Sequence, residues 1–233
     1  RPMKKIDQVA FIVQARLGSQ RVPQKMIRPF AGTTLLDIML DKLTNKSPII
    51  PNKNVFLSVH EKELKDIGNK YDLNIFHRSE ASANSEGTPV TEMYEWWDKL
   101  PHEYCVFINA CCPFLTVDSI ERFTSDYLKS DSNGMFGVVN KKNYYWDEAG
   151  AMVTPWPDGQ DVMNTKVVGV TKEAAHCLYA GKLSDIGKGI WMGKFNVPGD
   201  IELYSMDNEF EILDVDYEWQ FKMCEALYQA GYK

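Results

Sequence analysis

The chain has 233 residues, of which 44% are hydrophobic and 25% charged, and its formal net charge is −6. This length and composition fit one domain with a sizeable core and do not require a second. The negative charge excludes broad nucleic-acid binding, which needs a basic face, but it allows a small anionic substrate held by a few local cations.

The apolar segments and the cysteines together predict where in the cell the protein resides. No apolar run approaches the roughly 20 residues needed to cross a bilayer, and the first one, residues 9–13, is too short for a secretory signal. The five cysteines are odd in number and form no CxxC pair. Adjacent Cys111 and Cys112 are poorly placed to bond to each other. We expect a cytoplasmic protein with reduced cysteines and with neither membrane nor nucleic acid as a partner.

Short apolar runs alternate with amphipathic segments along the chain. Buried parallel strands are predicted at residues 9–13, 55–59, 104–108 and 135–139. Helices are predicted at residues 35–43, 61–71, 88–97, 117–128 and 217–228. In the last of these we expect Trp219 and Phe221 to pack inward. The alternation predicts an α/β, Rossmann-like fold with a mostly parallel sheet and helices on both faces.

Residues 140–208 differ from the rest of the chain. Trp146, Trp156 and Trp191 lie there among glycines and prolines. We interpret this region as an insertion on a single domain spanning residues 1–233, used for substrate closure, dimer contact or both. Ligands of parallel sheets bind beyond the carboxyl ends of the strands. The segment after the first strand is therefore the first candidate for a site.

That segment, residues 14–25, carries the most distinctive chemistry. Arg16, Arg21 and Lys25 place three cations within ten residues, interleaved with Gly18 and Ser19. Gly18 lets the backbone approach a ligand, Ser19 offers a hydroxyl, and the cations neutralise charge. The pattern indicates a polyphosphate-binding loop, although it is not a Walker A motif. A solvated basic loop is the alternative interpretation.

A second candidate element lies near the C-terminus. Asp214 and Asp216 are two residues apart, so on a strand both carboxylates would face the same side. Mg²⁺ prefers oxygen ligands and shares them with phosphates, which makes this pair a candidate metal anchor. The solvent face of an edge strand is the alternative.

These two elements resemble the CMP-sugar-acid synthetases. The first loop is similar to the family's A-R-x-x-S-x-R-x-P-x-K signature at Ala15, Arg16, Ser19, Arg21, Pro23 and Lys25. The likeness continues through residues 28–36, similar to R-P-L-x-G-x-P-L, which makes Arg28 a further candidate phosphate contact. Asp214-Val215-Asp216 resembles the family's D-[IV]-D metal motif before the last helix.

Two further segments carry the resemblance with departures. Residues 107–115 stand where the family has L-Q-P-T-S-P-L-R, with Asn109 in place of a glutamine. The Kdo branch has a metal-binding acid at the position of Cys111, so its absence tilts the resemblance toward the sialic-acid branch. Arg78 and Gly87 match positions that read the cytosine edge. For Arg78, a surface ion pair with Glu80 is the alternative.

The resemblance implies a cytidylyltransferase that moves CMP from CTP to the anomeric hydroxyl of a sialic-acid-like 2-keto sugar acid and releases pyrophosphate. It implies catalytic roles for Arg16, Lys25 and Asp216, Mg²⁺ at Asp214 and Asp216, and a homodimer. The implied nucleotide contacts are Ala15, Arg16, Gly18, Ser19, Arg21, Lys25, Arg78, Gly87 and Asn109.

Three alternatives remain at this point. One is a nucleotidyltransferase with another acceptor, such as Kdo, a phosphonate or a sugar phosphate. Another is a glycosyltransferase with a DxD motif, although that motif usually lies mid-chain. The third is a non-catalytic nucleotide sensor, which would not need Lys25, Asp214 and Asp216.

Overall fold

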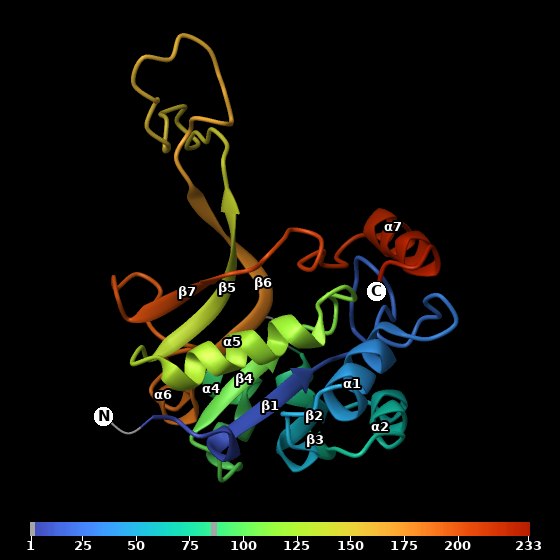
Figure 1. Ribbon diagram of the computed structural model, residues 1–233. Helices are drawn as coiled ribbons and strands as arrows, with labels where there is room; N and C mark the ends of the chain where they lie inside the picture. The colour runs from blue at the N-terminus through green and yellow to red at the C-terminus, as the bar shows by residue number, and fades with distance from the viewer. Residues whose placement is uncertain (1–2, 85–87) are drawn as a thin grey trace.

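The computed structural model describes residues 3–84 and 88–233 of the chain. Within them a seven-stranded sheet has the order β3-β2-β1-β4-β6-β5-β7 (Figure 1). The strands are β1 (Val9–Gln14), β2 (Val55–Val59), β3 (Asn74–His77), β4 (Tyr104–Ile108), β5 (Gly134–Lys141), β6 (Thr171–Lys182) and β7 (Ile201–Ser205).

Helices alternate with the strands in the first half of the chain. The α-helices are α1 (Leu35–Asn45), α2 (Lys62–Gly68), α3 (Glu80–Ala83), α4 (Val90–Met93), α5 (Val117–Lys129), α6 (Leu183–Ile186) and α7 (Glu218–Gln229). Short 3-10 helices lie at Ile6–Gln8, Asn52–Asn54 and Glu95–Asp98. Thr34 and Thr116 cap α1 and α5, because each side chain accepts an N–H from the first turn. No helix within the described ranges has the length and apolar character needed to cross a bilayer.

The sheet is mostly parallel, as the sequence predicts. β1 pairs in parallel with β2 and β4, and β2 with β3. β5 and β7 also pair in parallel, whereas β6 runs antiparallel to both β4 and β5. β6 is thus the reversed strand at the centre of the second half of the sheet.

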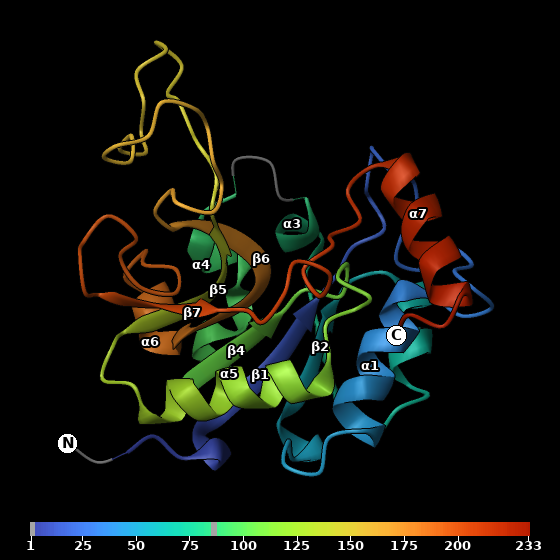
Figure 2. The ribbon, with the colours of Figure 1, turned by 45° about the horizontal axis from the view of Figure 1, so that its top comes forward.

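Two cores form because successive side chains of a strand point to opposite faces. Val9, Phe11 and Val13 of β1 pack into the larger core, under α1, α5 and α7. Ala10 and Ile12 face the smaller one, which Trp96 and α6 cover. Helices therefore cover both faces, as expected (Figure 2).

Two expectations about helices are wrong. The helix expected at residues 88–97 is broken: α4 ends at Met93, Tyr94 has φ −112° and ψ 50°, and a 3-10 turn follows. Pro89 rather than Thr88 is its N-cap. In α7, Phe221 is buried as expected, but Trp219 is 62% exposed, because its side chain falls on the solvent side of the helix.

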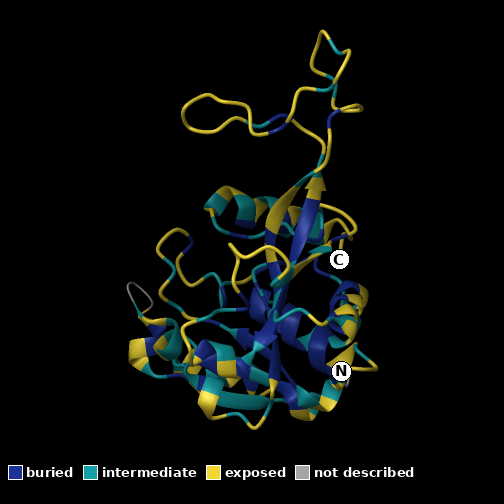
Figure 3. Ribbon diagram, turned by 90° about the vertical axis from the view of Figure 1, so that its left-hand side faces the viewer, coloured by how far each residue is buried: buried dark blue, intermediate teal, exposed yellow. Residues whose placement is uncertain are grey.

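The segment that leaves the sheet is narrower than residues 140–208. β6 and β7 both lie in that range and belong to the sheet, so the excursion covers residues 142–170 only. It extends away from the body of the molecule (Figure 1). Most of it is exposed to solvent (Figure 3). We call residues 142–170 the arm.

Candidate active site

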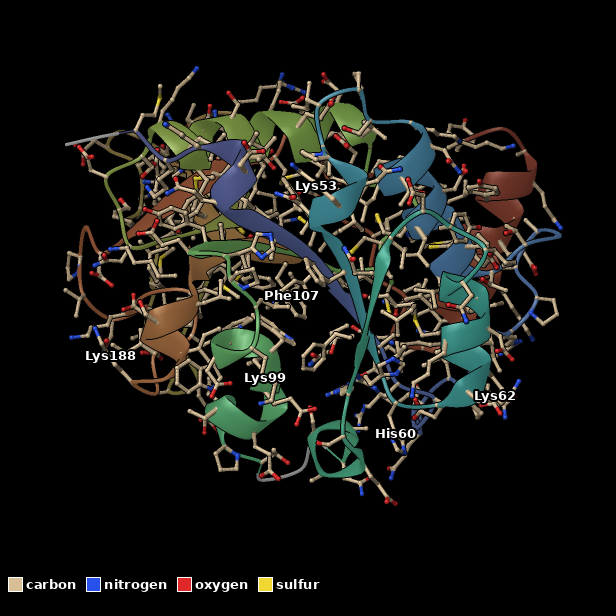
Figure 4. All side chains as sticks on the ribbon, turned by 90° about the horizontal axis from the view of Figure 1, so that it is seen from below. Lys53, His60, Lys62, Lys99, Phe107 and Lys188 are labelled. Atoms are coloured by element: carbon tan, nitrogen blue, oxygen red, sulfur yellow. The ribbon has the colours of Figure 1, made fainter. Side chains whose placement is uncertain are left out.

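A cleft of about 990 Å³ opens where β1, β2 and β3 end at their carboxyl ends. Its walls come from the loop after β1, from His60 and Glu61 after β2, and from Arg78 after β3. Phe107 of β4 also contributes, and Figure 4 labels it together with His60. The cleft lies where ligands of parallel α/β sheets bind. Seven of the expected nucleotide contacts line it: Ala15, Arg16, Gly18, Ser19, Arg21, Lys25 and Arg78.

The loop after β1 is held by its own hydrogen bonds. Ser19 N–H donates to Leu17 O at 2.8 Å, and the Ser19 hydroxyl accepts from Val22 N at 3.3 Å. Val22 is fully buried and anchors the middle of the loop. Among the described residues, Arg16 makes one long contact, from Nη1 to Ala83 O at 3.5 Å. Arg16 lines the cleft, where its guanidinium can meet an anion.

Lys25 joins this loop to the C-terminal carboxylates. Its Nζ donates to Val215 O at 2.9 Å and lies 3.8 Å from Asp216 Oδ1. Arg21 Nη2 lies 3.3 Å from the same carboxylate oxygen. The two motifs, about 190 residues apart in the chain, thus meet at one edge of the cleft. The sequence predicts this meeting only through the family resemblance.

The strand expected at Asp214 and Asp216 does not form. Residues 213–216 are irregular, and Val215 fixes them by donating its N–H to Cys111 O at 2.9 Å and by full burial of its side chain. The two carboxylates remain neighbours. Burial, and then the like charge of Asp216, raise the pKa of Asp214 to about 6.

Asp214 Oδ1 is a buried carboxylate oxygen with no hydrogen-bond partner in the described part of the chain. A buried acceptor of this kind is costly unless a ligand satisfies it. Within residues 3–84 and 88–233, no group of three or more His, Cys, Asp or Glu side chains is placed to hold a metal ion. Mg²⁺ often binds through one or two carboxylates plus substrate phosphates, and the pair fits that kind of site.

Arg78 is buried, so the alternative of a surface ion pair with Glu80 is wrong. It is 5% exposed, and its Nη1 donates to Ala15 O at 3.2 Å. Its Nη2 donates to Ser82 O at 2.7 Å, which ties the end of β1 to α3. Burial, and then the charge of Arg16, lower its pKa. Gly87, the other residue expected beside the base, lies outside the described residues.

Asn109 shapes the loop after β4 and is not among the cleft-lining residues. Its Nδ2 donates to His176 O at 2.9 Å, and its Oδ1 accepts from Cys111 N at 2.8 Å. Burial raises the pKa of the Cys111 thiol to about 11 and that of Cys112 further above its ordinary value. Neither thiol is an activated nucleophile. All five cysteines are free, as expected.

Arg28 does not point its charge into the cleft. Its guanidinium makes two hydrogen bonds to Glu218 of α7, at 2.7 and 2.5 Å, and lies 4.3 Å from the centre of the Phe221 ring. It is not among the residues that line the cleft. The expectation of a phosphate contact at Arg28 is therefore not supported by the geometry.

The sequence alone does not predict roles for Glu61, which lines the cleft, or for His176, whose charge acts on Asp214. Glu61 Oε1 accepts the N–H of Leu17 at 3.2 Å, while Oε2 is buried and has no partner among the described residues. Its place directly after β2 is the signal that could have found it. His176 has φ 49°, and its Nδ1 lies 2.8 Å from the Tyr179 hydroxyl. The irregular pairing of β5 with β6 near it has no marker in the sequence.

The family profile described as "Cytidylyltransferase" matches residues 10–176, which include the loop after β1, Arg78 and Asn109. The chain belongs to the cytidylyltransferase family. Asp214 and Asp216 lie beyond the matched residues. The family is defined by nucleotidyl transfer, so this member is placed among nucleotidyltransferase enzymes.

A curated relative matches a short part of the chain. The spore coat polysaccharide biosynthesis protein SpsF of Bacillus subtilis (strain 168) is 33% identical over 63 residues, which are 27% of this chain and 26% of that protein. The match thus spans about a quarter of that curated relative.

Solved structures share the fold. A CMP:2-keto-3-deoxy-manno-octonic acid synthetase complexed with CTP superposes with a TM-score of 0.69 at 9% identity, covering 95% of this chain and 98% of that one. A cytidylyltransferase from Leptospira borgpetersenii serovar Hardjo-bovis gives a TM-score of 0.63 at 16% identity, covering 96% and 87%. These likenesses establish the α/β fold of this cytidylyltransferase.

Proposed function

We propose that this cytidylyltransferase transfers CMP from CTP to the anomeric hydroxyl of a 2-keto sugar acid. The observation that carries the proposal is the contact of Lys25 with Val215 and Asp216, which joins a cationic loop to two carboxylates at one cleft. A triphosphate needs both: cations for its oxygens and carboxylates for its metal.

The reaction needs charge stabilisation more than a protein nucleophile. The acceptor hydroxyl gives up its proton to solvent and its oxygen bonds to the α-phosphorus. The bond from that phosphorus to the oxygen shared with the β-phosphate breaks, and pyrophosphate leaves with the negative charge. Arg16, Arg21 and Lys25 line the cleft and would neutralise that charge. The thiols of Cys111 and Cys112 have raised pKa values, which agrees with direct transfer.

Mg²⁺ is the metal we propose for this site. Asp214, whose buried Oδ1 has no partner among the residues that the structure describes, and Asp216 would hold it together with phosphate oxygens. When bound, the ion would polarise the phosphate oxygens. Asp216 pairs with Arg21 and Lys25 in the structure. These cations would therefore exchange a carboxylate partner for a phosphate partner as the nucleotide enters.

A sialic-acid-like compound is the acceptor we favour. By the resemblance, Cys111 occupies the position of the metal-binding acid of the Kdo branch, and a thiol with a raised pKa cannot replace a carboxylate. Kdo remains the main competing acceptor, because the Kdo synthetase shares the fold over nearly the whole chain. The spore coat polysaccharide protein supports a role in supplying activated sugars for a polysaccharide.

We also propose a homodimer formed through the arm. Exposed apolar side chains gather there, including Trp146, Val153, Val162, Met163 and Val167, each at least 43% exposed. A monomer seldom leaves that much apolar surface together in water. Sedimentation of the full chain and of a variant with Val153, Val162 and Met163 changed to serine would test this, and a wild-type monomer would refute it.

Pyrophosphate release tests the reaction itself. Each of the four NTPs would be incubated with Mg²⁺ and a panel of sugar acids, including N-acetylneuraminic acid and Kdo. Turnover with CTP alone, and only when a 2-keto acid is present, is the expected result. Turnover with sugar phosphates but not with 2-keto acids would refute the acceptor class. Absence of CTP-dependent turnover with every acceptor would refute the activity.

A further inference from the structure

The C-terminal helix α7 is fastened to the loop after β1 at several points. Besides the contacts of Arg21 and Lys25 with residues 215–216, Ala31 N–H donates to Glu225 Oε2 at 2.8 Å. Phe30 packs edge-on against Phe221, with ring centres 5.4 Å apart. Figure 2 shows α7 beside this loop and above α1. The ion pair of Arg28 with Glu218 stands at the centre of this contact.

Nucleotide binding would break some of these contacts and leave others intact. Arg21, Lys25 and Asp216 are the groups that a metal-bound triphosphate would engage, so their mutual pairs must loosen as it binds. Arg28 and Glu218 lie outside the cleft-lining set and face each other. Their pair can persist in both states. Together with the hydrogen bond from Ala31 to Glu225, it is thus a polar contact able to keep the two halves of the site together during the exchange.

The geometry of the pair suits such a role. Two parallel N–H···O bonds fix the orientation of both side chains as well as their distance. The pairing raises the pKa of Arg28 and lowers that of Glu218, so both stay charged near neutral pH. Glu218 is the first residue of α7, where a negative charge also favours the helix dipole. Phe221, one helical turn after Glu218, makes a cation–π contact with the Arg28 guanidinium.

We infer that Arg28 and Glu218 are positioning residues of the cytidylyltransferase reaction. They fix the position of the start of α7 relative to the phosphate-binding loop. Because Asp214 and Asp216 lie just before α7, their positions relative to that loop are fixed as well. The inference rests on the proposed function for its catalytic meaning. The Arg28–Glu218 ion pair itself is a property of the folded chain, and its effect on α7 can be measured without substrate.

Three variants separate positioning from direct phosphate binding. In Arg28→Ala and in Glu218→Ala the pair is lost, and we expect CTP affinity in the presence of Mg²⁺ to fall about tenfold in both, as for loss of a bidentate ion pair. The charge-reversed double variant R28E/E218R should regain most of that loss. If Arg28 bound phosphate directly, Glu218→Ala would leave CTP affinity unchanged or increase it, and the reversal would restore nothing.

Hydrogen exchange supplies a readout independent of CTP. We expect the amides of residues 218–229 to exchange faster in Arg28→Ala and Glu218→Ala, and to recover in R28E/E218R. Arg122→Ala is the matched control, because Arg122 of α5 pairs with Asp118 of the same helix and with Asp207 after β7, and it is not among the residues that line the cleft. It should change neither exchange of α7 nor CTP affinity.

The outcomes distinguish this inference from the proposed function. Suppose that the wild-type protein binds no CTP, but that the α7 amides exchange faster in the single variants and return to the wild-type rate in R28E/E218R. The ion pair then holds α7 as inferred, and the proposed function is refuted. If the wild type binds CTP and the single variants match Arg122→Ala in both measurements, the proposed function stands and the positioning role is refuted.

Discussion

Lys25 offers the sharpest test of the candidate site, because one atom serves both halves of it. Its Nζ donates to Val215 O at 2.9 Å and faces Asp216 Oδ1 at 3.8 Å, and its side chain is 17% exposed. Lys25→Met keeps the length and the apolar stem of the side chain and removes only the charge and the donors. The change leaves the Val215 carbonyl without this donor.

Two different magnitudes follow from that loss. A hydrogen bond involving a charged group contributes about 1.5–3 kcal/mol. For a domain of this size each kcal/mol shifts Tm by about 2–4 °C, so Tm should fall by about 3–12 °C. Removing a preorganised group that stabilises transition-state charge costs about 10²–10³-fold in turnover. A protein that remains folded at 25 °C should therefore be almost inactive.

Thermal unfolding and pyrophosphate release would be measured on the same preparations. Lys62→Met is the control, because Lys62 is a fully exposed lysine paired with Asp66 on α2 and should change neither quantity. Lys25→Arg should recover part of the activity, since it keeps the charge. If Lys25→Met retained turnover within threefold of wild type, Lys25 would be a structural link and no part of the catalytic machinery.

Three further predictions address other parts of the structure. Asp216→Asn should abolish Mg²⁺-dependent pyrophosphate release without unfolding the protein; near-wild-type turnover across an Mg²⁺ titration would contradict the metal assignment. Gly134→Ala should destabilise the chain severely in thermal unfolding, because a Cβ there would lie 1.8 Å from Met192 O. Gly169→Ala is its control, because a Cβ there meets no atom of residues 3–84 or 88–233 within 4 Å. Burial raises the pKa of Asp37, but hydrogen bonds from Lys70, Tyr71 and Thr34 outweigh it and leave the pKa below 3.8. The wild type should therefore unfold at a higher temperature than Asp37→Asn above about pH 4 and lose this advantage as the pH falls further; an advantage that persists at pH 2 would refute the assignment.

The strands that the sequence predicts well are those buried on both faces. β1, β2 and β4 are continuous apolar runs, and their residues are almost all buried. β7 lies at the edge of the sheet and exposes most of its side chains, so it carries no apolar run. The first half of β6 is also largely exposed, although its second half is buried. The sequence therefore does not predict either strand, and both fall within the expected insertion at residues 140–208.

The candidate site divides in a similar way. The loop of Arg16, Arg21 and Lys25 is local in sequence, and its composition indicates its chemistry without any tertiary information. The partner of Arg28 is different: Glu218 lies 190 residues away, and no local pattern links the two. The buried position of Arg78 depends likewise on α3, whose Ser82 accepts its hydrogen bonds. Partners across the fold had to come from the structure.

The same division explains how the site's charge is arranged. Around the loop after β1, the local sequence holds an excess of cations, and isolated they would repel one another. The fold brings Asp216 and Glu218 to Arg21, Lys25 and Arg28, so each of these three cations has a carboxylate partner. Only the cations that meet Asp216 can be transferred to a phosphate when the metal takes that carboxylate. Arg28 keeps Glu218, and this difference assigns separate roles to arginines that the sequence alone treats alike.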